Sequence, residues 1–319
     1  MKILLAATGG FAIPTLESLT SWVSKENLLV ISQPDRQRGR GRRQLPTPIK
    51  KQALKLDLTV ITPDNLNQPR LWQELTNFTP DYLVVVDYGR IIPLTLITLP
   101  RKAAINIHPS LLPAYRGPAP MIWCILNGEE KTGVTTQLVA EKVDTGDILL
   151  QTEFPLPPQI TLVEMENKLS LMGANLLRQT IEQYHAGHLK PRPQDDNLAS
   201  YAPKLDKSEG RLDWQQPAVN LERRIRALNP RPGTYTFWQG KRLKILAAVL
   251  PADKPLVLPE LSPGTIMVEK DLLLVVCGTG SLLQITRLQA ENKPPREAAD
   301  FIHGNRLKTG FRFTNKHQD

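Results

Sequence analysis

The stretch AAINIHPSLLPAYRGPAP, residues 103–120, joins the end of a buried strand to a proline-rich loop. Its apolar start is typical of a strand in a parallel sheet that is covered on both faces. Side chains alternate along a strand, so Asn106 and His108 point to one face and the isoleucines beside them to the other. Pro109 keeps His108 out of the helical region and the chain extended. We therefore expect two polar side chains at the carboxyl end of a central strand, where open parallel sheets bind ligands.

Four apolar runs precede this strand and alternate with amphipathic stretches. The expected strands are 2–7, 27–32, 58–61 and 81–86, and the expected helices lie near 11–24, 47–56, 67–78 and 119–127. This alternation predicts an α/β fold with a doubly wound, mostly parallel, Rossmann-like sheet. Two further strands are expected at 132–139 and 147–154, followed by a long amphipathic helix that begins after Thr161 and ends at Gly187.

A second domain is predicted after a linker. Residues 188–208 are polar and contain prolines without a sustained period, as linkers do. A helix near 216–228 and five short strands, at 233–238, 241–249, 264–268, 271–276 and 281–289, follow. They predict a small antiparallel β-barrel, OB-like or similar. The expected organisation is a catalytic domain at 1–187, a linker at 188–208 and a β-barrel domain at 209–319.

The composition of the 319 residues is that of a globular protein with excess positive charge. The start, MKILLAAT, is read as a buried strand and not as a signal peptide. We therefore expect a cytoplasmic protein, although a processed organelle protein would look the same. Cys124 and Cys277 form no CxxC motif, and no metal site is expected. The net charge of +9 arises mainly from residues 33–50 and 209–319, which favours a polyanionic partner.

Two further observations concern candidate catalytic residues. Among the five histidines, only His108 shares a strand end with a second polar side chain. The segment KVDTGDIL, residues 142–149, contains Asp144 and Asp147 among turn-forming residues. Either carboxylate could simply cap the turn, and the local sequence does not decide which of them, if either, folds back over His108.

The stretch INIHPSLLPAYRGPAP, followed by VDTGDIL, resembles the folate-dependent formyltransferases, whose signature is Asn-x-His-x-Ser-Leu-Leu-Pro with a later Asp. The segments QPDRQRGRG, VVVDYGRIIP, SYAPKL and IRALNPRPGTY resemble the branch of this family that formylates methionyl-tRNA. The resemblance covers nearly the whole chain. It implies a monomeric, metal-free enzyme of translation initiation that transfers the formyl group of 10-formyltetrahydrofolate to methionine on the initiator tRNA.

The resemblance also implies roles for individual residues. Asn106 and a protonated His108 would donate hydrogen bonds to the formyl oxygen, where negative charge develops during attack by the amine. Asp144 would orient His108, hold it protonated and help to receive the proton that the amine loses. The folate pocket would be formed by Ser110, Leu111, Leu112 and Pro113, with the pterin near Ile91 and Ile92.

The arginine run DRQRGRGRR, residues 35–43, would enter the acceptor-stem groove of the tRNA. A charge run is usually a solvated loop. Here glycines alternate with arginines directly after a strand of the sheet, so the loop can order against phosphates. The main contacts are expected from Arg40 and Arg42, with Arg38 and Arg43 in support. The basic second domain would add salt-dependent contacts to the tRNA backbone.

Four residues depart from the family pattern, and one of them, Arg231, occupies a position that is often aromatic. Members often read VVVAYGLILP where this chain has VVVDYGRIIP, so Asp87 and Arg90 introduce charge beside the expected pterin wall. The two could pair with each other at the rim, or they could alter folate affinity. Pro109 stands where glycine is expected and stiffens the turn after His108.

Two alternative functions remain open. A formyltransferase acting on a sugar nucleotide or another small amine would use the same three catalytic residues. The arginine loop and the basic second domain argue against it. An RNA-binding protein that kept the fold but lost turnover is the other alternative, and the complete Asn106, His108 and Asp144 set argues against that.

Overall fold

The structure, a computed structural model, describes residues 1–38, 43–252 and 260–314 and divides into two compact units. The first unit consists of Met1–Pro120, Glu130–Leu156 and Val163–Pro203. The second consists of Met121–Glu129, Pro157–Leu162 and Lys204–Asp319. None of the helices in the described ranges is long and apolar enough to cross a membrane.

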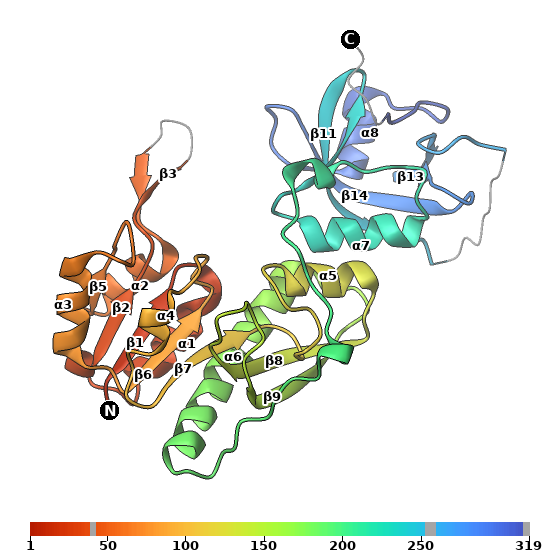
Figure 1. Cartoon of the computed structure of the whole chain (residues 1–319). Helices are drawn as coiled ribbons and strands as arrows, with labels where there is room; N and C mark the ends of the chain where they lie inside the picture. Colours follow the sequence, from red (N-terminus) through yellow and green to blue (C-terminus); the bar gives the residue numbers. More distant parts are fainter. Residues whose placement is uncertain (39–42, 253–259, 315–319) are drawn as a thin grey trace. The chain divides into compact units, whose positions relative to one another are not determined.

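The first unit is built on a seven-stranded sheet with the strand order β5-β2-β1-β6-β7-β8-β9 (Figure 1). The strands are β1 (Ile3–Ala7), β2 (Leu28–Ile31), β5 (Thr59–Ile61), β6 (Tyr82–Val86), β7 (Ala103–His108), β8 (Lys131–Leu138) and β9 (Ile148–Pro155). The strands from β5 to β7 are parallel, whereas β8 is antiparallel to both β7 and β9. Strand order reverses at β1, as in a doubly wound sheet. The predicted Rossmann-like architecture is confirmed.

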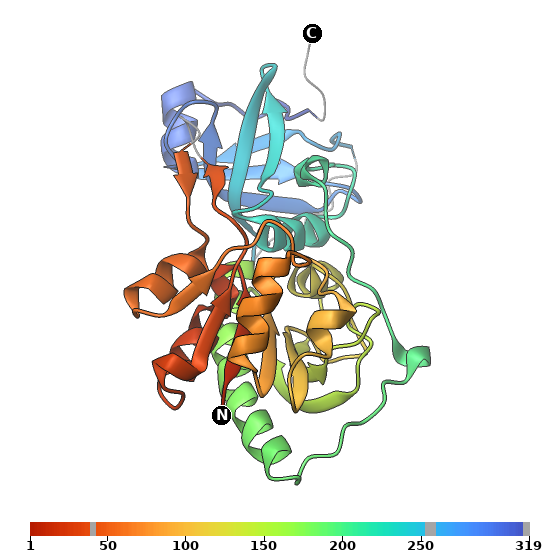
Figure 2. The ribbon, with the colours of Figure 1, turned by 60° about the vertical axis from the view of Figure 1, so that its left-hand side comes forward.

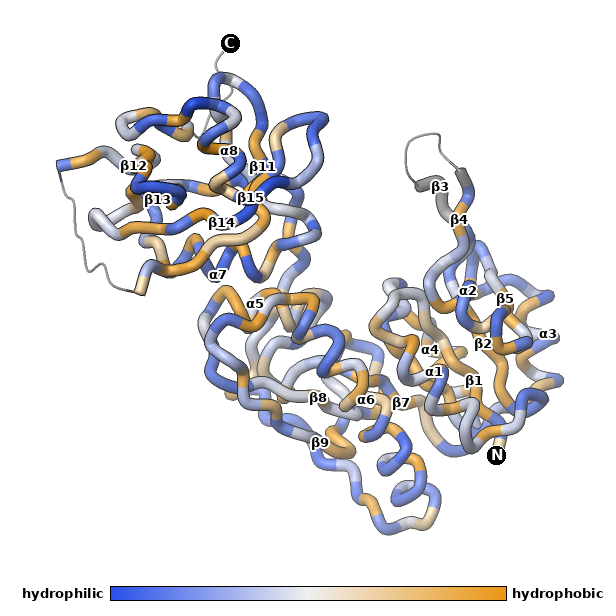
Figure 3. The backbone as a smooth tube through the Cα atoms, turned by 180° about the vertical axis from the view of Figure 1, so that it is seen from behind, coloured by the Kyte–Doolittle hydropathy of each residue, from blue (hydrophilic) through white to orange (hydrophobic). Residues whose placement is uncertain are grey.

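Helices cover both faces of this sheet (Figures 1 and 2). They are α1 (Ile13–Thr20), α2 (Pro48–Lys55), α3 (Pro69–Phe78), α4 (Leu94–Ile97) and α6 (Leu162–His185). Helices α3 and α4 share one core with strand residues such as Leu4 and Leu83. On the other face Gly173 of α6 lies so close to β7 that an added Cβ would stand 2.9 Å from Cγ2 of Ile107. Figure 3 shows β1 and β2 as mainly hydrophobic, as expected for strands buried on both faces.

A short two-stranded ladder projects from the first unit (Figure 1). It is formed by β3 (Arg36–Arg38) and β4 (Arg43–Leu45), which pair antiparallel with Arg38 opposite Arg43. The sequence predicted a loop here, because segments of three residues carry too little pattern to indicate a strand. The ladder lies within the predicted tRNA-binding segment, of which residues 39–42 are outside the described part of the chain.

The second unit contains a six-stranded antiparallel sheet with the order β10-β11-β14-β13-β12, to which β15 adds by pairing with β14. Its elements are α5 (Pro120–Asn127), α7 (Ala218–Leu228), β10 (Thr234–Trp238), β11 (Lys241–Val249), β12 (Ile266–Glu269), β13 (Leu272–Val276), β14 (Leu282–Ala290), β15 (Arg296–Glu297) and α8 (Ala298–Asn305). Beyond α8 the chain bridges both edges, because Thr314 pairs with Phe237 of β10 and Arg312 with Thr265 beside β12. Bridging both edges gives the predicted barrel-like closure.

Candidate active site

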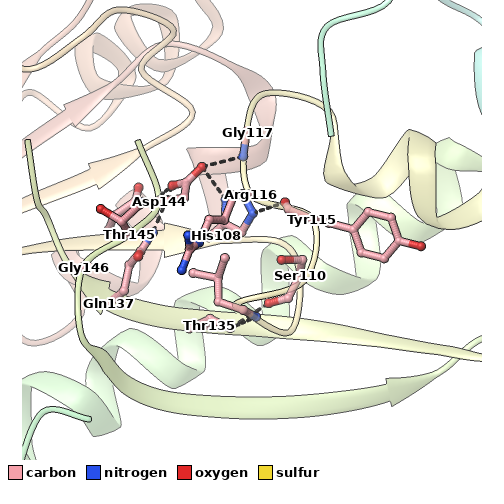
Figure 4. A network of polar contacts seen from close by, with 12 residues as sticks. His108, Ser110, Tyr115, Arg116, Gly117, Thr135, Gln137, Asp144, Thr145 and Gly146 are labelled. Atoms are coloured by element: carbon pink, nitrogen blue, oxygen red, sulfur yellow. Dashed lines mark hydrogen bonds and ion pairs between the residues drawn. The ribbon is translucent and has the colours of Figure 1, made fainter. Parts of the chain in front are cut away.

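The polar end of β7 meets the turn at residues 144–146 (Figure 4). Asn106 Nδ2 donates to Oδ1 of Asp144 at 3.2 Å, and His108 Nδ1 lies 3.5 Å from Oδ2 of the same carboxylate. The side chains of His108 and Asp144 are only 5% and 10% exposed, so water screens their interaction weakly. The structure therefore decides what the sequence left open: Asp144, and not Asp147, is the carboxylate that folds back over His108.

Both ring nitrogens of His108 face hydrogen-bond acceptors. Nε2 lies 2.8 Å from the main-chain carbonyl oxygen of Tyr115, and Nδ1 faces Asp144. A carbonyl oxygen can only accept, so Nε2 carries a hydrogen, and the carboxylate favours a hydrogen on Nδ1 as well. The ring is therefore held between the Tyr115 carbonyl and the Asp144 carboxylate.

Asp144 is surrounded by donors. Oδ1 accepts from Asn106 and from Nε2 of Gln137 at 2.9 Å, and Oδ2 accepts from the main-chain N–H of Gly117 at 2.9 Å while facing His108. A carboxylate offers about four lone-pair positions; three hydrogen bonds are accepted here, and His108 lies close to Oδ2. The group is therefore suited to fix the orientation of its donors.

The turn that carries Asp144 depends on its local backbone. Asp144 has a φ of 55°, in the left-handed region that residues other than glycine seldom adopt. At Gly146 an added Cβ would overlap with the carbonyl oxygen of Leu138, so the close approach requires glycine. Backbone strain of this kind persists only where surrounding contacts enforce it, and it is common at functional sites.

The loop after His108 is held by polar contacts within the unit. Ser110 Oγ donates to a main-chain carbonyl four residues later, and Leu112 N donates to Oγ1 of Thr135. Ser110 and Leu112 are buried, whereas Leu111 and Pro113 are partly exposed. The two buried residues therefore shape the loop, and the two partly exposed ones present its surface.

Gln137 and Gly117 contribute to the site but were not predicted from the sequence. Gln137 is the cross-strand partner of Asn106 in the antiparallel pairing of β7 with β8. Gly117 lies within the quoted proline-rich stretch and has a φ of 110°. An alternation argument extended from β7 to β8 could have found Gln137, but a main-chain donor such as Gly117 N leaves no side-chain signal.

A pocket of about 230 Å³ lies beside this site, at the carboxyl ends of β1, β2 and β6. It is lined by Thr8, Gly9, Gln33, Thr47, Asp87, Tyr88 and Gly89. Val85 of β6 pairs with Asn106 of β7, so the loop that follows β6 borders the loop that follows β7. On the same loop, Ile91 is 80% exposed and Ile92 packs against the core shared with α3 and α4.

Asp87 and Arg90 have separate partners. Arg90 Nη1 donates to the main-chain carbonyl of Asp64 at 2.8 Å. The Asp87 carboxylate lies against Gly9, where an added Cβ would overlap with Oδ2. Desolvation, and to a lesser degree the nearby charge of Glu166, raises the pKa of Asp87 to about 6. The alternative in which the two residues neutralise each other at the rim is therefore not what the structure contains.

The four predicted tRNA-binding arginines fall in or beside the β3–β4 ladder. The backbones of Arg38 and Arg43 pair across it, while Arg40 and Arg42 lie outside the described residues. Their role stays a prediction.

Comparison with known proteins gives consistent results for both units. The family described as Formyl transferase matches residues 1–181, and that described as Formyl transferase, C-terminal domain matches residues 204–306. A methionyl-tRNA formyltransferase from Roseiflexus sp. (strain RS-1) is 41% identical over 312 residues, which cover 98% of this chain and 95% of that protein. A second methionyl-tRNA formyltransferase, from Geobacter sulfurreducens, is 38% identical over 313 residues, which cover 98% of this chain and 96% of that protein. The fold is shared with the crystal structure of an N-formyltransferase from Helicobacter canadensis, in complex with folinic acid and dTDP-3-aminofucose. The TM-score is 0.67 at 18% identity, and the match covers 91% of this chain and 100% of that protein.

The raised pKa of Asp87 predicts a pH-dependent stability. Its ordinary pKa is 3.8, so the folded state holds this proton more tightly than the unfolded chain does. The free energy of unfolding should therefore fall as the pH rises from about 4 to about 6 and stay reduced above that. Asp87→Asn should stabilise the protein more at about pH 7.5 than at about pH 4.5, as measured by urea unfolding.

The exposed Asp64→Asn is the matched control, and it should change stability equally at both pH values. An equal effect of Asp87→Asn at the two pH values would contradict the assignment. Part of Asp87 reaches solvent, which screens its charge and keeps the difference between the two pH values small.

Proposed function

This chain belongs to the formyl transferase family, and from that premise we propose that it transfers the formyl group of 10-formyltetrahydrofolate to the amino group of methionyl-tRNA. The relatives of that name match it over nearly their whole length. The observation that carries the proposal is the convergence of Asn106 and His108 on the Asp144 carboxylate, at the carboxyl end of a central strand. We further propose that the enzyme works as a cytoplasmic monomer.

The reaction needs hydrogen-bond donors more than it needs a nucleophile from the protein. The substrate amine attacks the formyl carbon, a C–N bond forms, and negative charge develops on the formyl oxygen. When this intermediate collapses, the bond from the carbon to N10 of the folate breaks, N10 takes up a proton, and the attacking amine loses one. Donors placed where the charge develops lower the barrier, and each is typically worth roughly 10²–10³ in rate.

Asn106 and His108 are the two donors in this proposal. Asn106 gives one amide hydrogen to Asp144, and its second has no acceptor within the described part of the chain. His108 Nδ1 lies 3.5 Å from the same carboxylate, longer than a hydrogen bond, so its N–H is left to donate to a substrate oxygen that lies in the ring plane. Both donors therefore stand at one carboxylate, ready to bind a single oxyanion.

Asp144 is assigned to orientation. The family resemblance also implied that it helps to receive the proton of the amine. Its two oxygens already face four donors, which favours a carboxylate that stays in place and holds Asn106 and His108 in position. The proton of the amine is then released to solvent or to the folate nitrogen.

The folate would lie at the loops that follow β6 and β7. The apolar surface proposed for it comes from Leu111, Pro113 and the exposed Ile91, while Ser110, Leu112 and Ile92 hold these loops from within. No metal takes part in the proposed chemistry.

Two features support a polyanionic substrate. The β3–β4 ladder belongs to the segment at residues 33–50, which carries six basic residues and one acidic residue. In the second unit Arg242 stacks on Tyr235, with its guanidinium carbon 3.6 Å from the ring centre. Basic groups interleaved with aromatic rings suit phosphates and bases of RNA. A sugar nucleotide is the less favoured substrate, because likeness at 18% identity shows the fold alone.

A substrate comparison tests the proposed function. Purified enzyme is supplied with 10-formyltetrahydrofolate and with either charged initiator tRNA, free amines or amino-sugar nucleotides. Formylation of Met-tRNA, well above that of the small amines, is expected because the basic segment at residues 33–50 and the basic second unit suit a large polyanion. Transfer to small amines without transfer to Met-tRNA would refute the proposal.

His108→Ala should lower kcat for formyl transfer by roughly 10²–10⁴-fold, because it removes a charged donor from the oxyanion. Circular dichroism and thermal melting should show that the variant folds. The exposed His188→Ala, which lies outside the site, serves as the control and should leave kcat unchanged. Retained activity of His108→Ala would show that the mechanism is wrong.

Replacing Arg40 and Arg42 together by alanine should raise KM for Met-tRNA, because two phosphate-binding charges are lost. The difference in KM between the variant and the unmodified enzyme should shrink as salt is added, because counterion release drives such contacts. Binding of 10-formyltetrahydrofolate, measured by calorimetry, should not change. Equal weakening of folate and tRNA binding would indicate a structural role for the segment instead.

A further inference from the structure

We propose that Gln194 is a positioning residue of the active site, and that residues 192–202, here called the strap, hold both loops that orient His108. The strap lies in the polar segment that the sequence predicted as a linker. The proposal rests on the proposed function, since the effect on catalysis is measured as formyl transfer. It assigns no contact between Gln194 and a substrate.

Gln194 donates hydrogen bonds to the main chain of the turn that carries Asp144. Its Nε2 lies 2.9 Å from the carbonyl oxygen of Asp144, 2.7 Å from that of Gly146 and 3.1 Å from Oε1 of Gln137. An amide group has two hydrogens, which these three acceptors share. Gln194 thus fixes the backbone of Asp144 and also the side chain of Gln137, which is itself a donor to the Asp144 carboxylate.

Arg116 connects Gln194 to the second loop. Its Nε donates to Oε1 of Gln194 at 3.0 Å, and its Nη2 pairs with Asp196 at 2.7 Å. Arg116 stands between Tyr115, whose carbonyl accepts from His108, and Gly117, whose N–H donates to Asp144. The amide nitrogen of Gln194 therefore contacts the Asp144 turn, and its amide oxygen contacts the loop at residues 115–117.

The main chain of the strap adds further contacts to the same loop. Ser200 Oγ accepts from Tyr115 N at 2.9 Å, and the carbonyl of Ser200 accepts from Arg116 N at 2.8 Å. Ala202 N donates in return to the carbonyl of Arg116 at 2.7 Å. At the other end, Arg192 exchanges two main-chain hydrogen bonds with Ile148 of β9. The strap is thus anchored on the sheet and closes over the loop.

These contacts determine the surroundings of the catalytic imidazole. Both acceptors that face His108, the Tyr115 carbonyl and the Asp144 carboxylate, belong to segments that the strap holds. Exposed strap residues such as Leu198, which is 69% exposed, show that the strap runs over the surface and adds little to the core. Loss of Gln194 should therefore disturb the orientation of His108 more than the stability of the fold.

The test uses full-length Gln194→Met, which keeps the length of the side chain but removes all its hydrogen bonds. The exposed Leu198→Ala, on the same strap, is the matched control. With Met-tRNA and 10-formyltetrahydrofolate, kcat of Gln194→Met should fall by about 10- to 100-fold, the size found where residues that orient metal ligands are removed in other enzymes. KM for both substrates should stay within about threefold, because no binding contact is removed. The pH profile of kcat should shift, and the control should match the unmodified enzyme.

A second measurement does not depend on turnover. Side-chain ¹⁵N spectra of the histidines, assigned with His108→Ala, should show a changed titration of His108 in Gln194→Met and not in Leu198→Ala. A kcat within about twofold of the unmodified enzyme would overturn the proposal. The proposal would also be overturned if kcat and the melting temperature both fell while the pH profile and the His108 titration stayed unchanged. That result would mean a purely structural role. If the unmodified enzyme fails to formylate Met-tRNA, the proposed function fails, and the His108 titration still decides the role of Gln194.

Discussion

A single carboxylate, that of Asp144, holds the candidate active site together. It takes donors from three segments that are distant in sequence: the end of β7, the loop at Gly117 and strand β8 at Gln137. A charge that is nine-tenths shielded from water is costly unless it is fully hydrogen-bonded. Each of these segments must therefore reach its place for the others to be stable, which couples the correct folding of the first unit to the assembly of the site.

The sheet supplies the register that this carboxylate needs. Antiparallel pairing of β8 with β7 sets Gln137 directly opposite Asn106, so both amides reach the same oxygen of Asp144. The close approach of Gly173 to Ile107 fixes the opposite face of β7. A shift of the strand by one residue would reverse which of its side chains face the site. Because β8 runs antiparallel to β7, Leu138 at its end lies beside Ile105, and the loop that follows must fold back along β7 to bring Asp144 to Asn106 and His108.

The sequence predicted the fold wherever one periodic pattern persisted over enough residues. The buried strands of both units and the helices α1, α2, α3, α5, α6 and α7 were recognisable. Helix α8 was not predicted, and four-residue α4, the β3–β4 ladder and β15 were too short to show a period. Alternation along β7 sufficed to place Asn106 and His108 on one face. The choice between Asp144 and Asp147 was not available from local sequence, because both suit a turn. Gln194 escaped detection for a related reason: its partners lie about fifty residues away and bind it through polar contacts that leave no hydrophobic pattern.

The chain passes between the two units next to the loop at residues 115–117 and next to the strap. The loop at residues 115–117 runs on into Met121, and the strap runs on into Lys204, which are both points where the second unit begins. Just before these exits the two segments are tied together, since Ala119 N donates to the carbonyl of Ala202, and Ala202 N donates to that of Arg116. Both segments that border the candidate site are therefore held to each other within the first unit, up to the points where the chain leaves it.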